Sequence, residues 1–308
     1  MLGPRPVYHS LMAIGVLIIA LTILLAAHGI GAWALSGWAL ARRSPDPQST
    51  PDAFGLPYSK VTFPARDGVA LGGRLVGEGS PRPAVIFCPG LFGSMDGDTP
   101  LLPMFLDAGF DVLQFDWRAH GASEGERGSL GVAEINDALG AADFLYQRGT
   151  RQIGLMGFSF GGAVALRAAA RDDRIKAVVC DGGFVDVRHA FEGFASEKLA
   201  GVGARTISPL LRPLMALTFR LVEARLGASL TEAEPSAAVG MISPRPVFLI
   251  HGADDPLVPR ADQDAVFAAC GEPKSLWRVE GAGHREAHQV AAEEYRRRVV
   301  AFFREALL

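Results

Sequence analysis

Short apolar runs recur along the chain from residue 83 onward, and longer helical patterns lie between them. Strands that helices cover on both faces carry such uninterrupted apolar sequence. The runs are 83–88, 110–116, 152–157, 176–181, 246–251 and 274–280. Helices are expected at about 100–108, 132–147, 160–171, 261–270 and 288–306. The alternation predicts an α/β fold with a mostly parallel central sheet and helices on both of its faces.

Two intervals depart from this alternation. Before residue 83, "RDG" separates "KVTFPA" from "VALGGRLV", which is typical of a β-hairpin. Residues 185–240 are too long for a simple crossover and contain the apolar stretch "TISPLLRPLMALTFRLVEARLG". This interval predicts a small helical cap insertion, either extra packing helices or a lid over the substrate. Pro209 and Pro213 are expected to break or start helices within it.

The N-terminal part has a different composition. Residues 11–41 contain no Asp, Glu, Lys or Arg, and roughly 20 such residues in a helix can cross a bilayer. This predicts a single-pass transmembrane anchor. The alternative is a cleaved signal peptide ending at "ALA" (39–41), although its apolar region would be unusually long. "RRSPDPQSTPDAFGLP" follows and reads as a linker, so we expect an anchor and linker at 1–50 and the α/β domain, with its cap insertion at about 185–240, at 51–308.

Composition excludes several classes of function. The formal net charge of −3 provides no basic field, so no nucleic-acid partner is expected. The three cysteines (Cys88, Cys180 and Cys270) are far apart in sequence and fit neither a disulfide framework nor a metal-ligand spacing. The sequence therefore predicts no metal and no organic cofactor.

A candidate nucleophile lies in "GFSFGG" (157–162), where Gly157, Ser159 and Gly161 match G-x-S-x-G. An expected strand precedes this motif and an expected helix follows it. A sharp strand-to-helix turn lifts the serine hydroxyl out of the fold and needs small neighbours. We therefore interpret Ser159 as a nucleophile rather than as an ordinary turn residue.

A serine hydroxyl needs a base, and the base needs an orienting acid. His284 ends the glycine-rich loop "EGAGH" between the last expected strand and the last helix, which makes it the preferred base over His251 and His288. Two adjacent acids, Asp254 and Asp255, follow the strand at 246–251 in "HGADDPLVP". Either could be the acid, and the chain order is then Ser, Asp, His.

The motifs together resemble those of the α/β-hydrolase fold superfamily, over about residues 60–306. They are "CPGLFGS" (88–94), "DWRAHGASEG" (116–125), "GFSFGG", "HGADDPLVP" and "GAGH" (281–284). The resemblance implies a serine hydrolase with Ser159 as nucleophile, His284 as base and Asp255, rather than Asp254, as acid.

The resemblance also implies an oxyanion hole built from the backbone N–H groups of Leu91 and Phe160. Two positions depart from the usual pattern. Pro89 stands where the family commonly has histidine, and Ala119 stands where glycine is usual. Three further residues, Asp116, Arg118 and Ser123, are expected to brace their loop without a part in the chemistry.

We therefore predict an esterase-like serine hydrolase that cleaves ester-like acyl bonds through an acyl-enzyme, next to a membrane. Its substrate is expected to be a small-molecule ester or a lipid-like molecule. Within enzymes, the alternatives are a thioesterase or lipid acyl hydrolase and a prolyl-oligopeptidase-like peptidase. The last usually carries a large accessory domain, for which the roughly 60 residues before the first strand leave no room. The contrasting class is a catalytically silent binding protein with the same fold.

Overall fold

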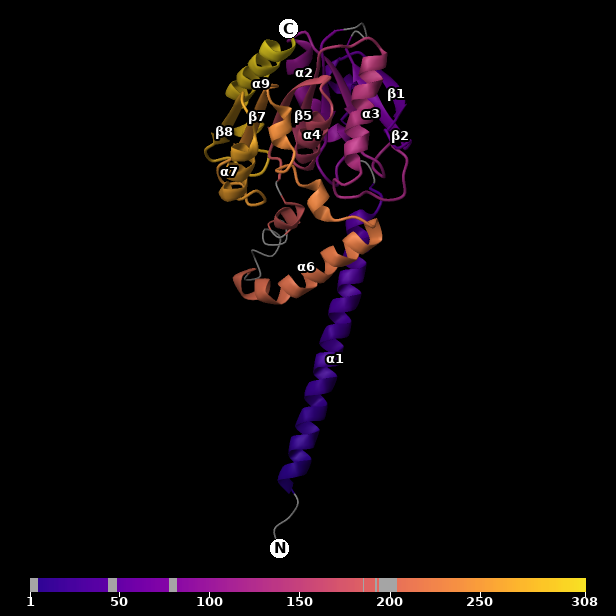
Figure 1. Cartoon of the computed structure of the whole chain (residues 1–308), viewed down its shortest axis with the longest axis vertical. Helices are drawn as coiled ribbons and strands as arrows, with labels where there is room; N and C mark the ends of the chain where they lie inside the picture. The colour runs from indigo at the N-terminus through magenta and orange to yellow at the C-terminus, as the bar shows by residue number, and fades with distance from the viewer. Residues whose placement is uncertain (1–4, 44–48, 78–81, 185, 192, 194–203) are drawn as a thin grey trace. The chain divides into compact units, whose positions relative to one another are not determined.

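An eight-stranded sheet forms the centre of the part of the chain that follows the N-terminal apolar helix in this computed structural model (Figure 1). The structure describes residues 5–43, 49–77, 82–184, 186–191, 193 and 204–308. The strand order is β1-β2-β4-β3-β5-β6-β7-β8, with β1, β2 and β4 paired antiparallel and the remaining neighbours parallel. The predicted α/β fold with a mostly parallel sheet is confirmed.

The strands lie close to the apolar runs and the hairpin expected from the sequence. Their bounds are β1 Tyr58–Pro64, β2 Ala70–Val76, β3 Ala84–Cys88, β4 Asp111–Phe115, β5 Ile153–Phe158, β6 Ile175–Asp181, β7 Val247–Gly252 and β8 Lys274–Val279. Every residue of β3, β4, β5 and β7 is buried. Two-sided burial is the reason that these strands are mostly apolar rather than alternating, with Asp111, Gln114 and His251 as their polar residues.

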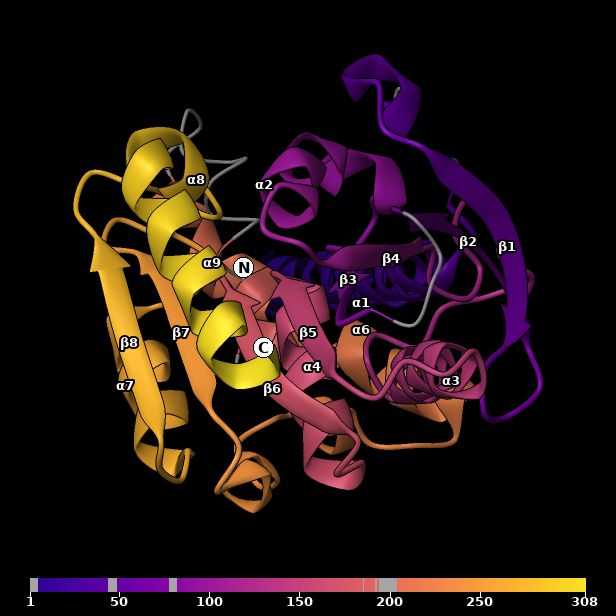
Figure 2. The ribbon, with the colours of Figure 1, turned by 90° about the horizontal axis from the view of Figure 1, so that it is seen from above.

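Helices cover both faces of the sheet (Figure 2). One face carries α2 (Leu102–Leu106) and α9 (Ala292–Leu307), which share a core cluster with the strands, and the short helix α8 (Ala287–Val290) precedes α9. The other face carries α3 (Glu134–Gln147), α4 (Phe160–Arg171) and α7 (Arg260–Ala269). In α9, the buried side chains recur every three or four residues, as an amphipathic helix requires. They are Tyr295, Val299, Phe303 and Leu307.

The N-terminal helix α1 (Arg5–Leu40) carries the uncharged stretch. Its part from Ser10 to Leu40 contains an 18-residue window with a mean hydropathy of 2.7 and is long and apolar enough to cross a membrane. Length and composition alone do not separate such a span from a signal sequence. By compactness, Met1–Ala39 and Leu199–Gly227 form one unit, and Leu40–Lys198 with Ala228–Leu308 forms the other.

By compactness the larger unit begins at Leu40, and residues 40–43 hydrogen-bond to a loop of that unit. One sequence expectation differs from the structure. In the expected insertion, helix α6 runs over Ala204–Leu226 and continues through Pro209 and Pro213, so the expected break there is wrong. A proline removes one helical hydrogen bond, and the other bonds of a 23-residue helix remain. Residues 194–203 of the insertion lie outside the described part of the chain.

Candidate active site

Ser159 occupies the sharp turn between β5 and α4. Its backbone angles, φ 52° and ψ −117°, lie in a region that side chains disfavour, and such strain is typical of functional positions. The turn needs glycine on both sides. A Cβ on Gly157 would lie 2.5 Å from the Gly161 carbonyl oxygen, and one on Gly161 would lie 1.9 Å from the Cys88 carbonyl oxygen. The packing therefore presents the serine while holding α4 against the end of β3.

Three side chains from three strand ends form one hydrogen-bonded chain. The Ser159 Oγ and the His284 Nε2 are 2.8 Å apart, and the His284 Nδ1 and the Asp255 Oδ2 are also 2.8 Å apart. A carboxylate only accepts, so Nδ1 carries the proton and Nε2 is free to accept from the serine hydroxyl. Ser159 follows β5, Asp255 follows β7 and His284 follows β8, so the carboxyl edge of the parallel sheet brings them together.

The two adjacent aspartates have different environments. The side chain of Asp255 is fully buried. Its second oxygen accepts hydrogen bonds from the N–H groups of Leu257 (2.8 Å) and Val258 (3.1 Å). Asp254 is exposed, and its N–H donates to the Ala282 carbonyl. Only Asp255 is placed to orient the imidazole.

Three other histidines have environments of their own. His251 is fully buried in β7, and burial lowers its pKa to about 4, so its ring is neutral. His120 is buried and its Nδ1 lies 2.9 Å from the Arg118 carbonyl oxygen. His288 packs with its ring centroid 6.0 Å from that of Tyr295. The imidazole of His284 is the one that lies at hydrogen-bond distance from the Ser159 Oγ among the described residues.

The sequence predicts the backbone N–H groups of Leu91 and Phe160 as oxyanion donors, and both residues lie close to Ser159. Phe160 is the first residue of α4, where a backbone N–H has no partner within the helix. Leu91 lies in the loop after β3 and lines the same cavity as Ser159. This loop is held by the Trp117 indole, which donates to the Pro89 carbonyl at 2.8 Å. The histidine-to-proline departure therefore leaves a fixed loop with the Leu91 N–H present.

Gly161→Ala is expected to disturb these two donors together. The added Cβ would lie 1.9 Å from the Cys88 carbonyl oxygen and 2.6 Å from that of Pro89, so α4 and the 89–91 loop must separate. Because each oxyanion donor contributes about 10²–10³ in rate, we expect kcat to fall at least about 100-fold. The measurement is ester turnover per folded molecule.

Gly140→Ala is the matched control for this loss. A Cβ at Gly140 in α3 would lie 2.4 Å from the Pro64 carbonyl oxygen, far from Ser159 in the chain and in the sheet. Both variants should lose stability, and only Gly161→Ala should lose turnover once unfolded molecules are removed. Equal kcat in the two variants would contradict a role for this contact in the site.

A cavity of about 220 Å³ opens at Ser159 and His284. Among the residues that the structure describes, the rest of its lining is apolar and comes from the loop after β3, from the start of the insertion and from the loop after β7. The apolar lining residues are Leu91, Phe92, Phe184, Val187, Ala190, Phe191, Leu257 and Val258. Phe158 and Phe160, which flank the nucleophile in sequence, are buried beneath it and are not among them. The cavity fits a small apolar group next to a reactive carbonyl.

A buried charged network that the sequence analysis missed lies behind His284. The guanidinium of Arg285 pairs with Asp98 and lies 4.6 Å from the centroid of the Phe158 ring. Nearby, Tyr295 donates a 2.8 Å hydrogen bond to Asp181, whose carbonyl accepts the Ser159 N–H. Burial lowers the pKa of Arg285, and the two carboxylates raise it by more, so the guanidinium stays charged. The network anchors both the histidine loop and the serine turn.

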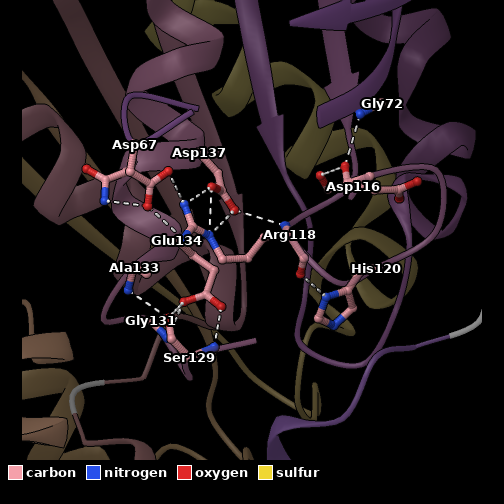
Figure 3. Close-up of polar contacts among 12 residues, drawn as sticks. Asp67, Gly72, Asp116, Arg118, His120, Ser129, Gly131, Ala133, Glu134 and Asp137 are labelled. Carbon is pink, nitrogen blue, oxygen red and sulfur yellow. Dashed lines mark hydrogen bonds and ion pairs between the residues drawn. The ribbon is translucent and has the colours of Figure 1, made fainter. Parts of the chain in front are cut away.

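The loop that begins at Asp116 is braced as expected (Figure 3). Asp116 accepts N–H groups from Met95 and Ala122, and the Ser123 hydroxyl donates to the Asp116 carbonyl. The backbone N–H and guanidinium of Arg118 donate to Asp137, and the guanidinium also donates to Asp67, across the loop. None of these three bracing residues lines the cavity.

Ala119 adopts φ 57°, the left-handed conformation that explains why glycine is usual at this position. For alanine this conformation costs about 1 kcal/mol. Its N–H donates to the Glu124 carbonyl and its carbonyl accepts from the Arg43 N–H, so bonds within the catalytic unit hold the conformation.

Comparisons with known proteins agree with this architecture. A family model described as "alpha/beta hydrolase fold" matches residues 83–221. The protein YfhR of Escherichia coli K12 is 27% identical over 275 residues, covering 85% of this chain and 84% of that protein. Among solved structures, the Pyrococcus furiosus esterase Pf2001 superposes with a TM-score of 0.70 at 24% identity, over 87% of this chain and 100% of that one. The α/β hydrolase GrgF from Penicillium sp. sh18 gives a TM-score of 0.64 at 25% identity, over 82% and 99%.

The family model, the sheet order and the superpositions agree on the fold. Residues 83–221 match the model of the α/β-hydrolase fold, and the chain as a whole has this fold.

Proposed function

We propose that this protein is a serine hydrolase that cleaves ester-like acyl bonds through an acyl-enzyme. The observation that carries the proposal is the hydrogen-bonded chain of Ser159, His284 and Asp255 at the mouth of an apolar cavity. The second oxygen of Asp255 is satisfied by backbone N–H groups, so the carboxylate is held in one orientation. This is the arrangement that acyl transfer by a serine requires.

The mechanism follows from these positions. The Ser159 Oγ attacks the substrate carbonyl carbon while the His284 Nε2 takes the hydroxyl proton, and Asp255 stabilises the imidazolium. The N–H groups of Leu91 and Phe160 receive the negative charge that develops on the carbonyl oxygen. His284 then gives its proton to the leaving alkoxide, which leaves the acyl group on Ser159. Water, deprotonated by His284, attacks the acyl carbon, and the serine leaves with the proton restored.

The cavity favours esters of small apolar acyl groups. Its volume of about 220 Å³ is below the roughly 300–1,000 Å³ of sites for drug-sized ligands, and the walls that the described residues form are apolar. As part of the same proposal, α1 anchors the enzyme to a membrane as a single span. Membrane anchoring would place the site where lipid-like esters are available, and the cavity would then receive a short acyl chain.

Covalent labelling of Ser159 tests the proposal directly. The full chain in detergent micelles is treated with a fluorophosphonate, and its intact mass is measured. We expect one adduct per chain, because only a serine activated by a base attacks this reagent at a useful rate. Ser159→Ala should give no adduct. Ser123→Ala is the matched control, since Ser123 is a buried serine with a structural hydrogen bond, and it should label like the wild type.

Wild-type protein that is folded by circular dichroism yet forms no adduct would contradict the proposal and favour a binding role. When labelling succeeds, esters and thioesters of increasing acyl length separate the remaining reaction classes. We expect turnover to fall once the acyl group exceeds the cavity.

A further inference from the structure

Leu40, the last residue of α1, and the three residues that follow it, 41–43, are bonded or bridged to a loop of the larger unit. The Arg43 N–H donates to the Ala119 carbonyl at 2.8 Å, and the Arg43 carbonyl accepts from Gly121 at 3.3 Å. The Leu40 carbonyl accepts from Gly128 at 2.9 Å. The receiving residues belong to the loop that Asp116, Arg118 and Ser123 brace (Figure 3). A segment that the sequence presents as linker is thus part of the catalytic fold.

The two consecutive arginines of this segment have different partners. The guanidinium of Arg42 donates to the carbonyls of Gly125 (2.9 Å) and Gly121 (3.0 Å), and the side chain is exposed. The guanidinium carbon of Arg43 lies 4.3 Å from the centroid of the Phe92 ring, within the range of a cation–π interaction. Burial lowers the pKa of Arg43. The side chain of Arg42 therefore contacts only the backbone of the loop in these bonds, whereas the side chain of Arg43 contacts Phe92, a residue that lines the cavity.

Phe92 links the wall of the cavity to the loop that carries Leu91. It lines the cavity with Ser159, and its ring meets that of Phe191 edge-on at 5.9 Å between centroids. Its φ of 67° lies in the left-handed region, which is strained for an aromatic residue, so contacts of the side chain must hold it there. It directly follows Leu91, whose N–H is the proposed oxyanion donor. A change in the Phe92 side chain therefore acts on both cavity shape and donor position.

We propose that Arg43 is a positioning residue that holds Phe92, and through it Leu91, and so ties the geometry of the active-site cavity to the chain segment that leaves the N-terminal apolar helix. The inference rests on the proposed function of Ser159 and Leu91. Its physical basis is the stacking of a cation on the outer face of an aromatic ring whose backbone is strained.

The test uses the full chain in detergent micelles, as wild type and as Arg43→Ala, Arg43→Lys and Arg42→Ala. Three quantities are measured: the rate constant of fluorophosphonate labelling, the Tm, and hydrogen exchange of the peptide spanning residues 88–93. Arg43→Ala is expected to slow labelling about 3- to 30-fold, the range of one cation–π contact, and to speed exchange in that peptide. Arg43→Lys keeps a cation near the ring and should recover part of the rate.

Arg42→Ala is the control for simple tethering. It removes two bonds to the same loop without touching Phe92, so it should lower the Tm at least as much as Arg43→Ala while leaving the labelling rate close to that of the wild type. In the background of Phe92→Ala, Arg43→Ala should slow labelling no further, because the residue through which it acts is gone.

Equal slowing by Arg42→Ala and Arg43→Ala would overturn the inference, since the segment would then act only as a tether. Unchanged labelling and unchanged exchange in Arg43→Ala would overturn it as well. Failure of the proposed function is separable from both outcomes. If the wild type is not labelled, faster exchange at residues 88–93 in Arg43→Ala but not in Arg42→Ala still supports the positioning role, and its absence overturns it.

Discussion

Ser159→Ala is expected to lower kcat/KM for a short-chain ester by about 10⁴- to 10⁶-fold, the range found when a serine nucleophile is removed. Without the Oγ no acyl-enzyme forms, and water alone must attack a carbonyl held against the Leu91 and Phe160 N–H groups. These two donors and the cavity do not depend on the hydroxyl, so a small residual rate above the uncatalysed reaction should remain. Steady-state kinetics with purified full chain measures both quantities.

The more informative variant is the double substitution Ser159→Ala, His284→Ala. A base without a nucleophile has nothing to activate, so the double variant should be about as active as Ser159→Ala alone rather than weaker by the product of the two losses. His288→Ala serves as the control, because His288 lies one turn further along and packs on Tyr295 instead of Ser159. If the loss of kcat/KM in the double variant equalled the product of the losses in the two single variants, His284 would act independently of Ser159, and this result would contradict the proposed mechanism.

Local sequence patterns were sufficient to predict the strands and the helix that position the candidate site residues. The strands before Ser159 and Asp255 are apolar runs, and the turns after them and before His284 are rich in glycine or acidic residues, so both signals are local. Once parallel strands are expected, their carboxyl ends must share one edge, so residues far apart in sequence can be placed together without a structure. Helix α4 was predictable for the same reason, because a run of alanines follows the motif.

Packing decided what those patterns left undetermined. Pro213 was expected to interrupt a helix, and α6 continues through it because a helix loses only one hydrogen bond at a proline. The polar residues 42–50 looked like linker throughout, and only the partners of Leu40–Arg43 reveal that the first of them belong to the catalytic unit. The composition of a segment does not show which distant residues it contacts. Arg42 donates hydrogen bonds to a loop about 80 positions away in the sequence, so its place in the fold could not be predicted locally.

The buried network behind His284 had no local signal at all. Arg285 and Asp98 are 187 positions apart, and Tyr295 and Asp181 are 114 apart. A single arginine after a candidate histidine is unremarkable in sequence, since most arginines are solvated. Only a fold that buries Asp98 and Asp181 at the same place makes that arginine necessary, because an isolated buried carboxylate is costly.

The choice between the two adjacent aspartates leads to the second large effect. Asp255→Asn is expected to lower kcat/KM about 10⁴-fold, while Asp254→Asn should change it little. The asparagine amide keeps the size of the side chain but can donate to His284, which favours the tautomer whose Nε2 carries a proton and cannot accept one from Ser159. Asp254 is exposed and does not orient the imidazole of His284. Asp254→Asn therefore controls for the loss of one negative charge at this place in the loop.

The rate of fluorophosphonate labelling and the Tm, measured together on the Asp255 and Asp254 variants, distinguish a role in orienting His284 from a role in stabilising the fold. Asp255 also accepts the N–H groups of Leu257 and Val258, so Asp255→Asn should lower the Tm to some extent. Asp255→Glu keeps the negative charge and moves the carboxylate by one methylene. If the main role of Asp255 is to orient His284, this variant should exceed Asp255→Asn clearly in kcat/KM and only slightly in Tm. If Asp254→Asn were instead the inactive variant, the 2.8 Å contact between Asp255 and His284 would not be the catalytic one. The acid would then have to reach the histidine from the exposed side of the loop, a movement that breaks the Asp254 N–H bond to Ala282.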